Sequence, residues 1–514
     1  GDDGAGYRLS AHHYQSNGFR DNPYLGREDT NGRDETSFRA RVDWSAGDNW
    51  DFRLTGMLSD VDNGYDAFAI DNSLTVLSNR PGRDAQRSTG ASFNIDWAGS
   101  EHVRVTSVTS YADSDIDFSF DADWGNDDAW APVLYDYVSL NDRRRRTFNR
   151  EVRAISTEDG RIFGGTTDWL VGFYFNQLDE NLTTINQGDY FDPGFNFSDA
   201  LDDRIDSKFE AMSLAVFGQL EFAVGDAGRL TIGTRIERRE VEYIDTSGLD
   251  LAPNDPMIGG EIAYNHTFSE RTSGFARLSR GYKGGGFNLG LVPVGSREFD
   301  SEYLWSLELG ARTNLVDDRL FLNGTIFYNL RDEQQVETSF QLDPNDPASF
   351  VFYTANAAQG DAVGVELEVS WLPTDNLELY LNLGLLNATF DTFVTPLVDA
   401  SGRDQAHAPS YTFAAGAAYT HDSGWFGRFD VSGMDEFYFD VSHDQVSESY
   451  VIANARLGYQ ADRWSAQLWL RNAFDERYAV RGFFFGNEPP LFPPTLYIRQ
   501  GDPRHAGVTF DWRF

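Results

Sequence analysis

The chain has 514 residues, no cysteine, and 81 acidic against 42 basic side chains, which gives a formal net charge of −39. The absence of cysteine excludes disulfides and thiolate metal sites, and the negative charge is opposite to the basic surface that nucleic-acid binding needs. Aromatic residues make up 15% of the chain, far more than a disordered acidic protein carries. No apolar run is long enough to form a transmembrane helix.

The predicted elements are β-strands. The first is expected at about residues 6–17, and strict alternation of apolar and polar positions then recurs at 230–237, 303–312, 377–385 and 411–419. The last alternation, residues 506–514, places Val508, Phe510 and Trp512 on one face and polar or small residues on the other. A soluble sandwich could produce any one of these strands. Their repetition along the chain, with aromatic rings near the strand ends, is typical of strands with one face in lipid.

The connections between the strands alternate in length. Short turns are expected at 45–49, 98–101, 224–228, 269–271, 316–318, 373–375, 421–424 and 460–463, with a longer one at 157–167. Long connections are expected between them, at 20–33, 60–87, 117–144, 180–208, 283–302, 331–356, 388–409, 434–448 and 476–504. Short periplasmic turns and long outer loops predict an all-β fold, a transmembrane antiparallel β-barrel with about 20 visible strands.

Several segments resemble one family, the TonB-dependent outer-membrane receptors. They are SRGYKGGGFN at 279–288, ELGAR at 308–312 with RL at 319–320 and TIFYN at 325–329, GVELE at 364–368, NAFDERY at 472–478, GDPR at 501–504 with Phe514, WLVGFY at 169–174, and NREVR at 149–153. The resemblance covers most of residues 6–514 and lies in the order and spacing of these segments. It implies a closed barrel of about 22 strands, so that the visible ones are strands 3 to 22.

The resemblance implies a function as well. Such receptors take up a scarce nutrient, for example a ferric siderophore, across the outer membrane of a Gram-negative bacterium. The TonB–ExbB–ExbD system supplies the energy through a plug that precedes the barrel. Residues 1–514 show neither a plug nor the first two strands, so we expect a fragment, with a smaller closed barrel as the alternative. The alternative functions are a plugless passive channel or adhesin and, less favoured, a soluble acidic β protein.

No enzymatic or cofactor motif stands out. The 8 histidines show no metal-binding spacing, and Gly284–Gly286 is not followed by the helix and lysine of a phosphate-binding loop. The sequence therefore predicts no catalytic residue, no metal site and no cofactor. Alternate carboxylates at Asp121, Asp123 and Asp127 have the chemistry of a Ca²⁺ loop, but a solvated acidic loop is favoured, because the bidentate glutamate of such loops is missing.

Binding residues are expected in the outer loops and the lumen. The predicted substrate contacts are Trp124, Trp130, Tyr190, Phe191, Phe195, Phe484, Arg235 and Arg312. Exposed rings are costly unless they contact something, although loops packing on one another would also cover them. A second set, Arg143, Arg144, Arg145 and Arg146, opens a strand at the outer rim, where guanidinium groups could bind lipopolysaccharide phosphates or form only a charged rim.

Overall fold

The computed structural model describes residues 5–290, 292, 295–341, 350–394 and 399–514. One antiparallel sheet of 21 strands contains almost all of this described chain. Its strands are β1 (Ala5–Ser16), β4 (Arg33–Ala46), β5 (Trp50–Tyr65), β6 (Gly82–Trp97), β7 (Val103–Asp121), β8 (Leu134–Ser156), β9 (Thr167–Asp192), β10 (Phe197–Val224), β11 (Gly228–Asp245), β12 (Asp250–Leu251), β13 (Asn254–Ser269), β14 (Thr272–Lys283), β17 (Glu302–Leu315), β18 (Leu320–Gln341), β19 (Phe350–Thr374), β20 (Leu377–Phe393), β21 (Tyr411–Thr420), β22 (Trp425–Met434), β23 (Tyr450–Gln460), β24 (Trp464–Arg471) and β27 (His505–Trp512).

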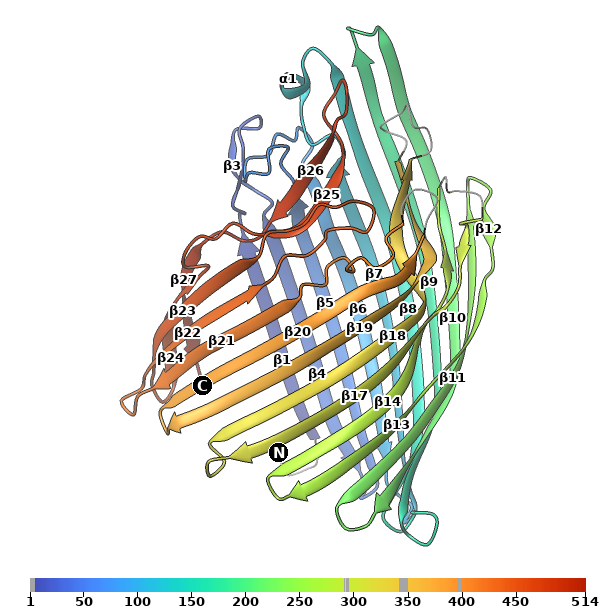
Figure 1. Ribbon diagram of the computed structural model, residues 1–514, viewed down its shortest axis with the longest axis vertical. Helices are drawn as coiled ribbons and strands as arrows, with labels where there is room; N and C mark the ends of the chain where they lie inside the picture. Colours follow the sequence, from blue (N-terminus) through green and yellow to red (C-terminus); the bar gives the residue numbers. More distant parts are fainter. Residues whose placement is uncertain (1–4, 291, 293–294, 342–349, 395–398) are drawn as a thin grey trace.

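Each long strand pairs with the next along the chain, so the sheet is built from hairpins. The sheet curls until its first strands lie behind its later ones, across an interior (Figure 1). Both chain ends lie near the rim that carries the short turns (Figure 1). Among the described residues, β1 pairs only with β4 and β27 only with β24. Within the described residues, the wall therefore has two unpaired edges.

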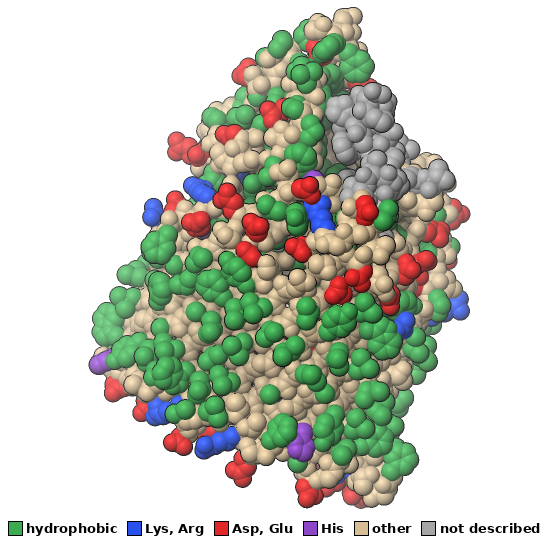
Figure 2. All heavy atoms as spheres, in the orientation of Figure 1, with side chains coloured by type: hydrophobic (Ala, Val, Ile, Leu, Met, Phe, Trp, Pro, Cys, Tyr) green, Lys and Arg blue, Asp and Glu red, His purple; other side chains and the backbone are tan. Residues whose placement is uncertain are grey.

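The two faces of the wall differ as the alternation predicts. Ile232 and Ile236 on β11 and Leu307 and Leu309 on β17 are exposed. Figure 2 shows a broad hydrophobic surface over the strands. Apolar rows that lie exposed rather than against a second sheet fit a wall in contact with lipid, and they contradict a sandwich core. The opposite faces of the same strands carry polar residues such as Arg235 and line the interior.

The outer loops contain the remaining elements. They are the hairpins β2 (Arg20–Asn22) with β3 (Arg27–Thr30), β15 (Gly286–Phe287) with β16 (Glu298–Phe299), and β25 (Ala479–Gly486) with β26 (Pro494–Gln500), and the helix α1 (Asp127–Trp130). No helix in the described residues is long and apolar enough to cross a membrane. The hairpin β25–β26 lies within residues 476–504, which the sequence alone predicted as one long loop. The prediction missed the hairpin because this segment shows no regular alternation of apolar and polar residues.

Candidate functional site

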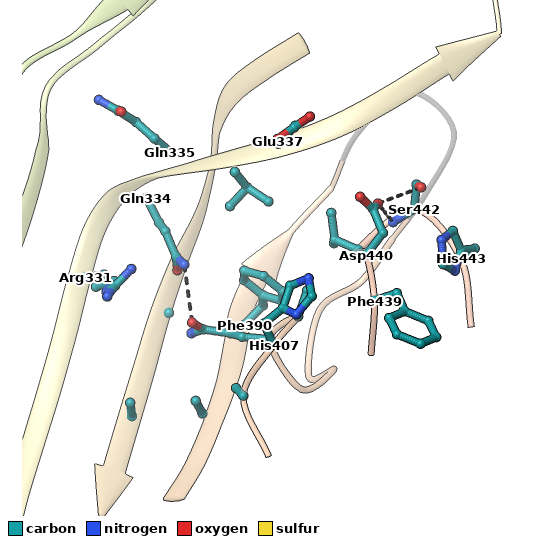
Figure 3. Close-up of a pocket in the computed structure, with 18 of the residues that line it drawn as sticks. Arg331, Gln334, Gln335, Glu337, Phe390, His407, Phe439, Asp440, Ser442 and His443 are labelled. Carbon is teal, nitrogen blue, oxygen red and sulfur yellow. Dashed lines mark hydrogen bonds between the residues drawn. The ribbon is translucent and has the colours of Figure 1, made fainter. Parts of the chain in front are cut away.

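A cavity of about 610 Å³ opens where the outer part of the wall meets the inward-folded loops (Figure 3). The inner faces of β18, β19 and β20 form its wall, and residues 405–408, 439–443 and 481–485 cover it. The wall residues are spaced two apart along each strand, for example Phe327, Asn329 and Arg331 on β18. Since side chains alternate across a sheet, this spacing places the cavity on the interior side of the barrel.

Small residues on the wall make room for the cavity. Gly360 on β19 faces two glutamines, and a Cβ atom there would lie 2.4 Å from Gln334 Oε1 and 2.8 Å from Gln405 Nε2. Gln334 donates from Nε2 to Gln405 Oε1 at 3.3 Å, and Gln405 donates from Nε2 to the carbonyl of Thr389 at 3.0 Å. The glycine thus allows the loop at Gln405 to approach the wall closely.

The cavity holds two acceptors that no described residue satisfies. Gln334 Oε1 and Asn329 Oδ1 are both buried without a hydrogen-bond partner in the described part of the chain. A buried carbonyl oxygen without a partner is costly. These two oxygens are therefore available to a donor group on a bound ligand or to water.

Cationic and aromatic groups surround the same space. Arg331 extends from the wall and lies 3.6 Å from Glu302, while the guanidinium carbon of Arg481 lies 4.6 Å from the ring centre of Phe483. The rings of Phe390, Phe439 and Phe484 also line the cavity. This combination can hold a ligand that has both a planar apolar surface and negative charge.

Two histidines lie in the loops over the cavity, and both are half-buried. Burial lowers the pKa of His407, and the nearby charge of Arg481 lowers it further. Burial also lowers the pKa of His443, against the charge of Asp440, which raises it. The ring of His407 lies 5.0 Å from that of Phe437, and the ring of His443 lies 5.4 Å from that of Phe484. Both histidines are therefore neutral at neutral pH.

The cavity loops should accordingly loosen in acid. An unfolded histidine takes up a proton near its ordinary pKa of 6.5, whereas these two take it up only at lower pH. The neutral histidines therefore stabilise the folded loops fully above pH 6.5, the pKa of an unfolded histidine. This stabilisation is lost as the pH falls from 6.5 through the lowered pKa of the folded state. We expect amide hydrogen exchange in 405–408 and 439–443 to accelerate, beyond the intrinsic pH effect, between about pH 7.5 and about pH 5. The double variant His407→Gln with His443→Gln should lose this acceleration; an unchanged response in that variant would contradict the assignment.

Arg403 holds the loop above the cavity in place. This guanidinium donates to the carbonyl oxygens of Val441 and His443 and lies 3.1 Å from the carboxylate of Asp444. Its carbon also lies 4.1 Å from the ring centre of Tyr438. Because one side chain satisfies several carbonyls of the turn, residues 440–444 keep a defined position over the cavity.

Among the predicted contacts, Phe484 lines this cavity. Trp124 and Trp130 lie instead in a cluster where outer loops pack on the β25–β26 hairpin. Trp124 stacks on Phe68 with ring centres 5.0 Å apart and meets Tyr497 edge-on at 5.1 Å, while Trp130 is buried. Packing between loops, the second possibility raised by the sequence, thus accounts for the position of both tryptophans.

Tyr190, Phe191 and Phe195 belong to the hairpin β9–β10. Tyr190 lies 5.9 Å from the ring of Phe492, at the border of the loop cluster. Phe191 and Phe195 lie toward the tip of the hairpin, and Phe195 is 70% exposed. The fold does not bring these three residues to the cavity.

Arg235 and Arg312 face the interior, as predicted. Arg235 donates to Glu237 and to the hydroxyl of Tyr282, and its guanidinium lies over the ring of Tyr174 at 4.9 Å. It lines a separate interior cavity of about 520 Å³. Arg312 pairs with Ser273 near the rim of short turns and is exposed.

The arginine run at the outer rim is divided between the two faces of β8. Arg143 and Arg145 face the interior and lie within 4 Å of Glu180, whereas Arg144 and Arg146 face outward and lie 2.9 and 3.4 Å from Asp113. Adjacent residues on a strand point to opposite faces, so the four cannot act as one clamp. Contact with lipopolysaccharide phosphates stays a prediction for Arg144 and Arg146.

The acidic loop at Asp121 and Asp123 is buried rather than solvated. Both oxygens of Asp123 accept hydrogen bonds, from the amides of Gly125 and Tyr137 and from Trp130 Nε1. Burial, and then the charge of Asp123, raise the pKa of Asp121 to about 8, so this carboxyl keeps its proton at neutral pH. These two side chains organise the loop from inside.

Sequence reasoning missed most of the groups at the cavity. They are Arg331, Gln334, Phe390, His407, Phe439, His443 and Arg481. A usable signal existed for the wall residues alone, since inward positions near the outer ends of β18–β20 follow from the alternation. The loop residues carry no local pattern that places them together.

Comparisons with known proteins identify the family to which the barrel wall belongs. The model of the family described as TonB dependent receptor-like, beta-barrel matches residues 1–473. A curated relative, the pesticin receptor of Yersinia pestis, is 23% identical over 352 residues, which are 66% of this chain and 48% of that protein. The chain thus spans about half the length of the curated relatives it matches.

Solved structures agree with the sequence match. The ferric yersiniabactin uptake receptor FyuA from Yersinia pestis is similar with a TM-score of 0.81 at 17% identity, covering 100% of this chain and 76% of that one. The siderophore receptor PiuA from Acinetobacter baumannii has a TM-score of 0.76 at 15% identity, with 99% and 77% covered. These relatives are receptors, and at such identities the likeness establishes the fold. With the family model matching nearly the whole wall, the chain belongs to the TonB-dependent receptors, of which it forms the β-barrel.

Proposed function

We propose that this chain is the barrel of an outer-membrane receptor that takes up a scarce nutrient with energy supplied by the TonB–ExbB–ExbD system. The proposal rests on the cavity of about 610 Å³ lined by β18–β20 and the loops at 405–408, 439–443 and 481–485, called the mouth cavity from here on. It opens to the interior and combines Arg331 and Arg481 with several phenylalanine rings. Relatives named for siderophore uptake and for pesticin recognition support it. The substrate class that fits is an anionic chelate with aromatic groups, such as a ferric siderophore.

Local charge explains how such a ligand can bind despite the net charge of −39. Acidic side chains repel a free anion at long range, but salt screens that field within about 8 Å at physiological ionic strength. Arg331 and Arg481 line the cavity together with the carboxylates of Glu337, Asp361 and Asp440, so a ligand anion is favoured only where it lies directly beside an arginine. A chelate that spreads its charge over a planar surface is therefore favoured over a small free anion.

Arg481→Ala tests this assignment. The change removes a cavity cation, so growth on a limiting ferric siderophore should fail at concentrations that support the unaltered receptor. Affinity, measured by tryptophan quenching with the siderophore that supports growth, should fall by about tenfold, as expected for a lost charge-assisted contact. Arg27→Ala is the matched control, since Arg27 is an exposed outer-loop arginine that does not line the cavity. Equal affinity in both variants would remove the support for the cavity as the binding site.

We further propose that other segments complete the wall and fill the lumen. The edges of β1 and β27 have no second partner among the described strands. Unpaired backbone groups in hydrocarbon cost several kcal/mol each, roughly, so the edges need pairing strands. In the proposed receptor, strands next to these edges close the barrel, and a plug lies inside it and contacts TonB.

Conductance separates this receptor from a passive channel. The complete gene product should show almost no steady current in a planar bilayer, because a plug occupies the interior. Uptake should also stop in cells that lack TonB. A large steady conductance of the complete product, with uptake independent of TonB, would favour the channel.

A further inference from the structure

The hairpin β9–β10 extends far beyond the rest of the wall (Figure 1). Its strands have 26 and 28 residues, whereas about 10 are enough to cross the outer membrane. The neighbouring strand β11 is shorter and ends at Asp245, opposite Ser207. The outer part of β10, from Phe197 to Asp206, therefore pairs with β9 alone.

Some backbone amides and carbonyls of this segment face the side of β10 on which β11 lies, called the open side because β11 ends at Asp245. The amide of Asp206 donates to Thr246 Oγ1 at 3.1 Å, and the amide of Thr246 donates to the carbonyl of Asp206 at 3.0 Å. Both groups of Asp206 are thus directed to the side on which β11 lies. In an antiparallel strand this direction repeats at every second residue, so the amides and carbonyls of residues 198, 200, 202 and 204 face the same side, where no described strand follows. Every residue from Phe197 to Arg204 is exposed.

An exposed edge of this kind is a template for another strand, and its chemistry selects the partner. Asp199, Asp202 and Asp203 form no ion pair with any described residue, while Arg204 is already paired with Asp206 at 2.9 Å. A second copy of the edge would bring like charges together. An extended segment with cationic side chains would instead place them beside these carboxylates.

We propose that the outer edge of β10 at residues 198–204 binds an extended, cation-bearing segment of another protein by strand addition. The backbone groups of the four outward-directed residues pair with the segment. Asp199 and Asp203 on one face of β10, and Asp202 on the other, select cationic side chains on the matching faces of the segment. Phe195 and Phe197, 70% and 56% exposed at the tip, give the partner an apolar contact. This edge is independent of the mouth cavity, so the proposal neither needs nor tests nutrient uptake.

The test uses the complete gene product in detergent, in which the proposed closing strands cover the edges of β1 and β27, and a capped peptide of alternating lysine and threonine, long enough to pair with residues 198–204. Binding is measured by fluorescence anisotropy at low salt. A peptide of the same charge, methylated on alternate backbone nitrogens, should bind at least about tenfold more weakly, because it cannot donate to the edge. Equal binding of the two peptides would show simple charge attraction and overturn the proposal.

Variants of the edge give the complementary test. Ala200→Pro removes one amide that faces the open side and leaves the pairing with β9 intact, so affinity should fall by about fivefold to tenfold, while Ala200→Val should bind as the unaltered protein does. Changing Asp199, Asp202 and Asp203 to Asn should weaken both the binding and its dependence on salt, whereas the same change at three exposed aspartates elsewhere should not. Binding unaffected by the proline, or a dimer of the unaltered protein that Ala200→Pro dissociates, would overturn the proposal, the latter because a second copy would occupy the edge.

Discussion

Replacing Gly360 with leucine is expected to weaken ligand binding at the mouth cavity by about tenfold to a hundredfold, which corresponds to about 1–3 kcal/mol for overpacking a close contact. The new Cβ would lie 2.4 Å from Gln334 Oε1 and 3.2 Å from the carbonyl of Thr389. The glutamine pair must then separate, the loop at Gln405 moves away from the wall, and the rest of the leucine enters the cavity. Tryptophan quenching with the siderophore that supports growth measures the loss.

Gly56→Leu is the control for this variant. Gly56 lies on β5, and a Cβ there meets nothing within 4 Å. The control should bind ligand with unchanged affinity and insert in the membrane normally. If Gly360→Leu also bound normally, the ligand would have to lie elsewhere, and the other interior cavity at Arg235 would become the candidate.

Replacing Asp123 with alanine should release the β25–β26 hairpin from the outer loops. The carboxylate of Asp123 is fully buried and accepts from Gly125 N at 2.9 Å, Trp130 Nε1 at 3.0 Å and Tyr137 N at 2.8 Å. Each donor left unsatisfied costs about 1–3 kcal/mol, so the loop that contains α1 should lose most of its local stability. Asn487, next to β25, donates to the carbonyl of Asp123 at 3.0 Å. Disorder in the loop that contains Asp123 should therefore also destabilise the β25–β26 hairpin.

Hydrogen exchange measures this release. Amides in 121–137 and 479–500 should exchange at least about tenfold faster, as a local loss above 1.4 kcal/mol implies, while the strands of the wall stay protected. Asp128→Ala is the control, because Asp128 lies in the same loop and is exposed. Protection of the hairpin equal to that in the control would show that aromatic packing alone, for example Trp124 on Phe68, holds it.

Release of the β25–β26 hairpin should also change the positions of residues that line the mouth cavity. Residues 481–485 of the same hairpin line the cavity opposite the wall. The hairpin further accepts and donates hydrogen bonds with Asn72, whose side chain pairs with the backbone of Leu496 and Ile498. Loop packing on one side of the mouth thus positions cavity residues on the other, and Asp123→Ala should weaken ligand binding without touching the cavity.

The strands were predictable because their signal is local. Leu230 to Glu237 alternates, and the structure places Ile232 and Ile236 on the exposed face and Arg235 inside. The short turns and most of the long loops fall at opposite rims as predicted, because a two-residue period and a turn of a few residues need no distant contact. The same rule would have divided the arginine run at 143–146 between the two faces of β8. The long loop predicted at 180–208 was wrong: β9 and β10 extend through it and leave only residues 193–196 between them, since their pairing continues beyond the membrane.

The candidate site was less predictable. Phe484 was found because an aromatic run in a long loop is conspicuous, but its neighbours His407 and His443 come from connections far away in the chain. Trp124 and Trp130 were predicted on the same grounds as Phe484, as aromatic residues in a long loop. In the structure they pack one loop against another. A ring in a loop shows that something will cover it, and the sequence does not say whether that is a ligand or another loop.

The sequence by itself determined a membrane wall: its alternation decides which face of each strand meets lipid, and its turns decide the direction of each strand. Only the tertiary structure decided where the loops converge, because the cavity and the loop cluster depend on contacts between residues hundreds of positions apart, such as Asn487 with Asp123. The open edge of β10 is also a tertiary property, since it arises from a difference in length between paired neighbours that no single strand reveals.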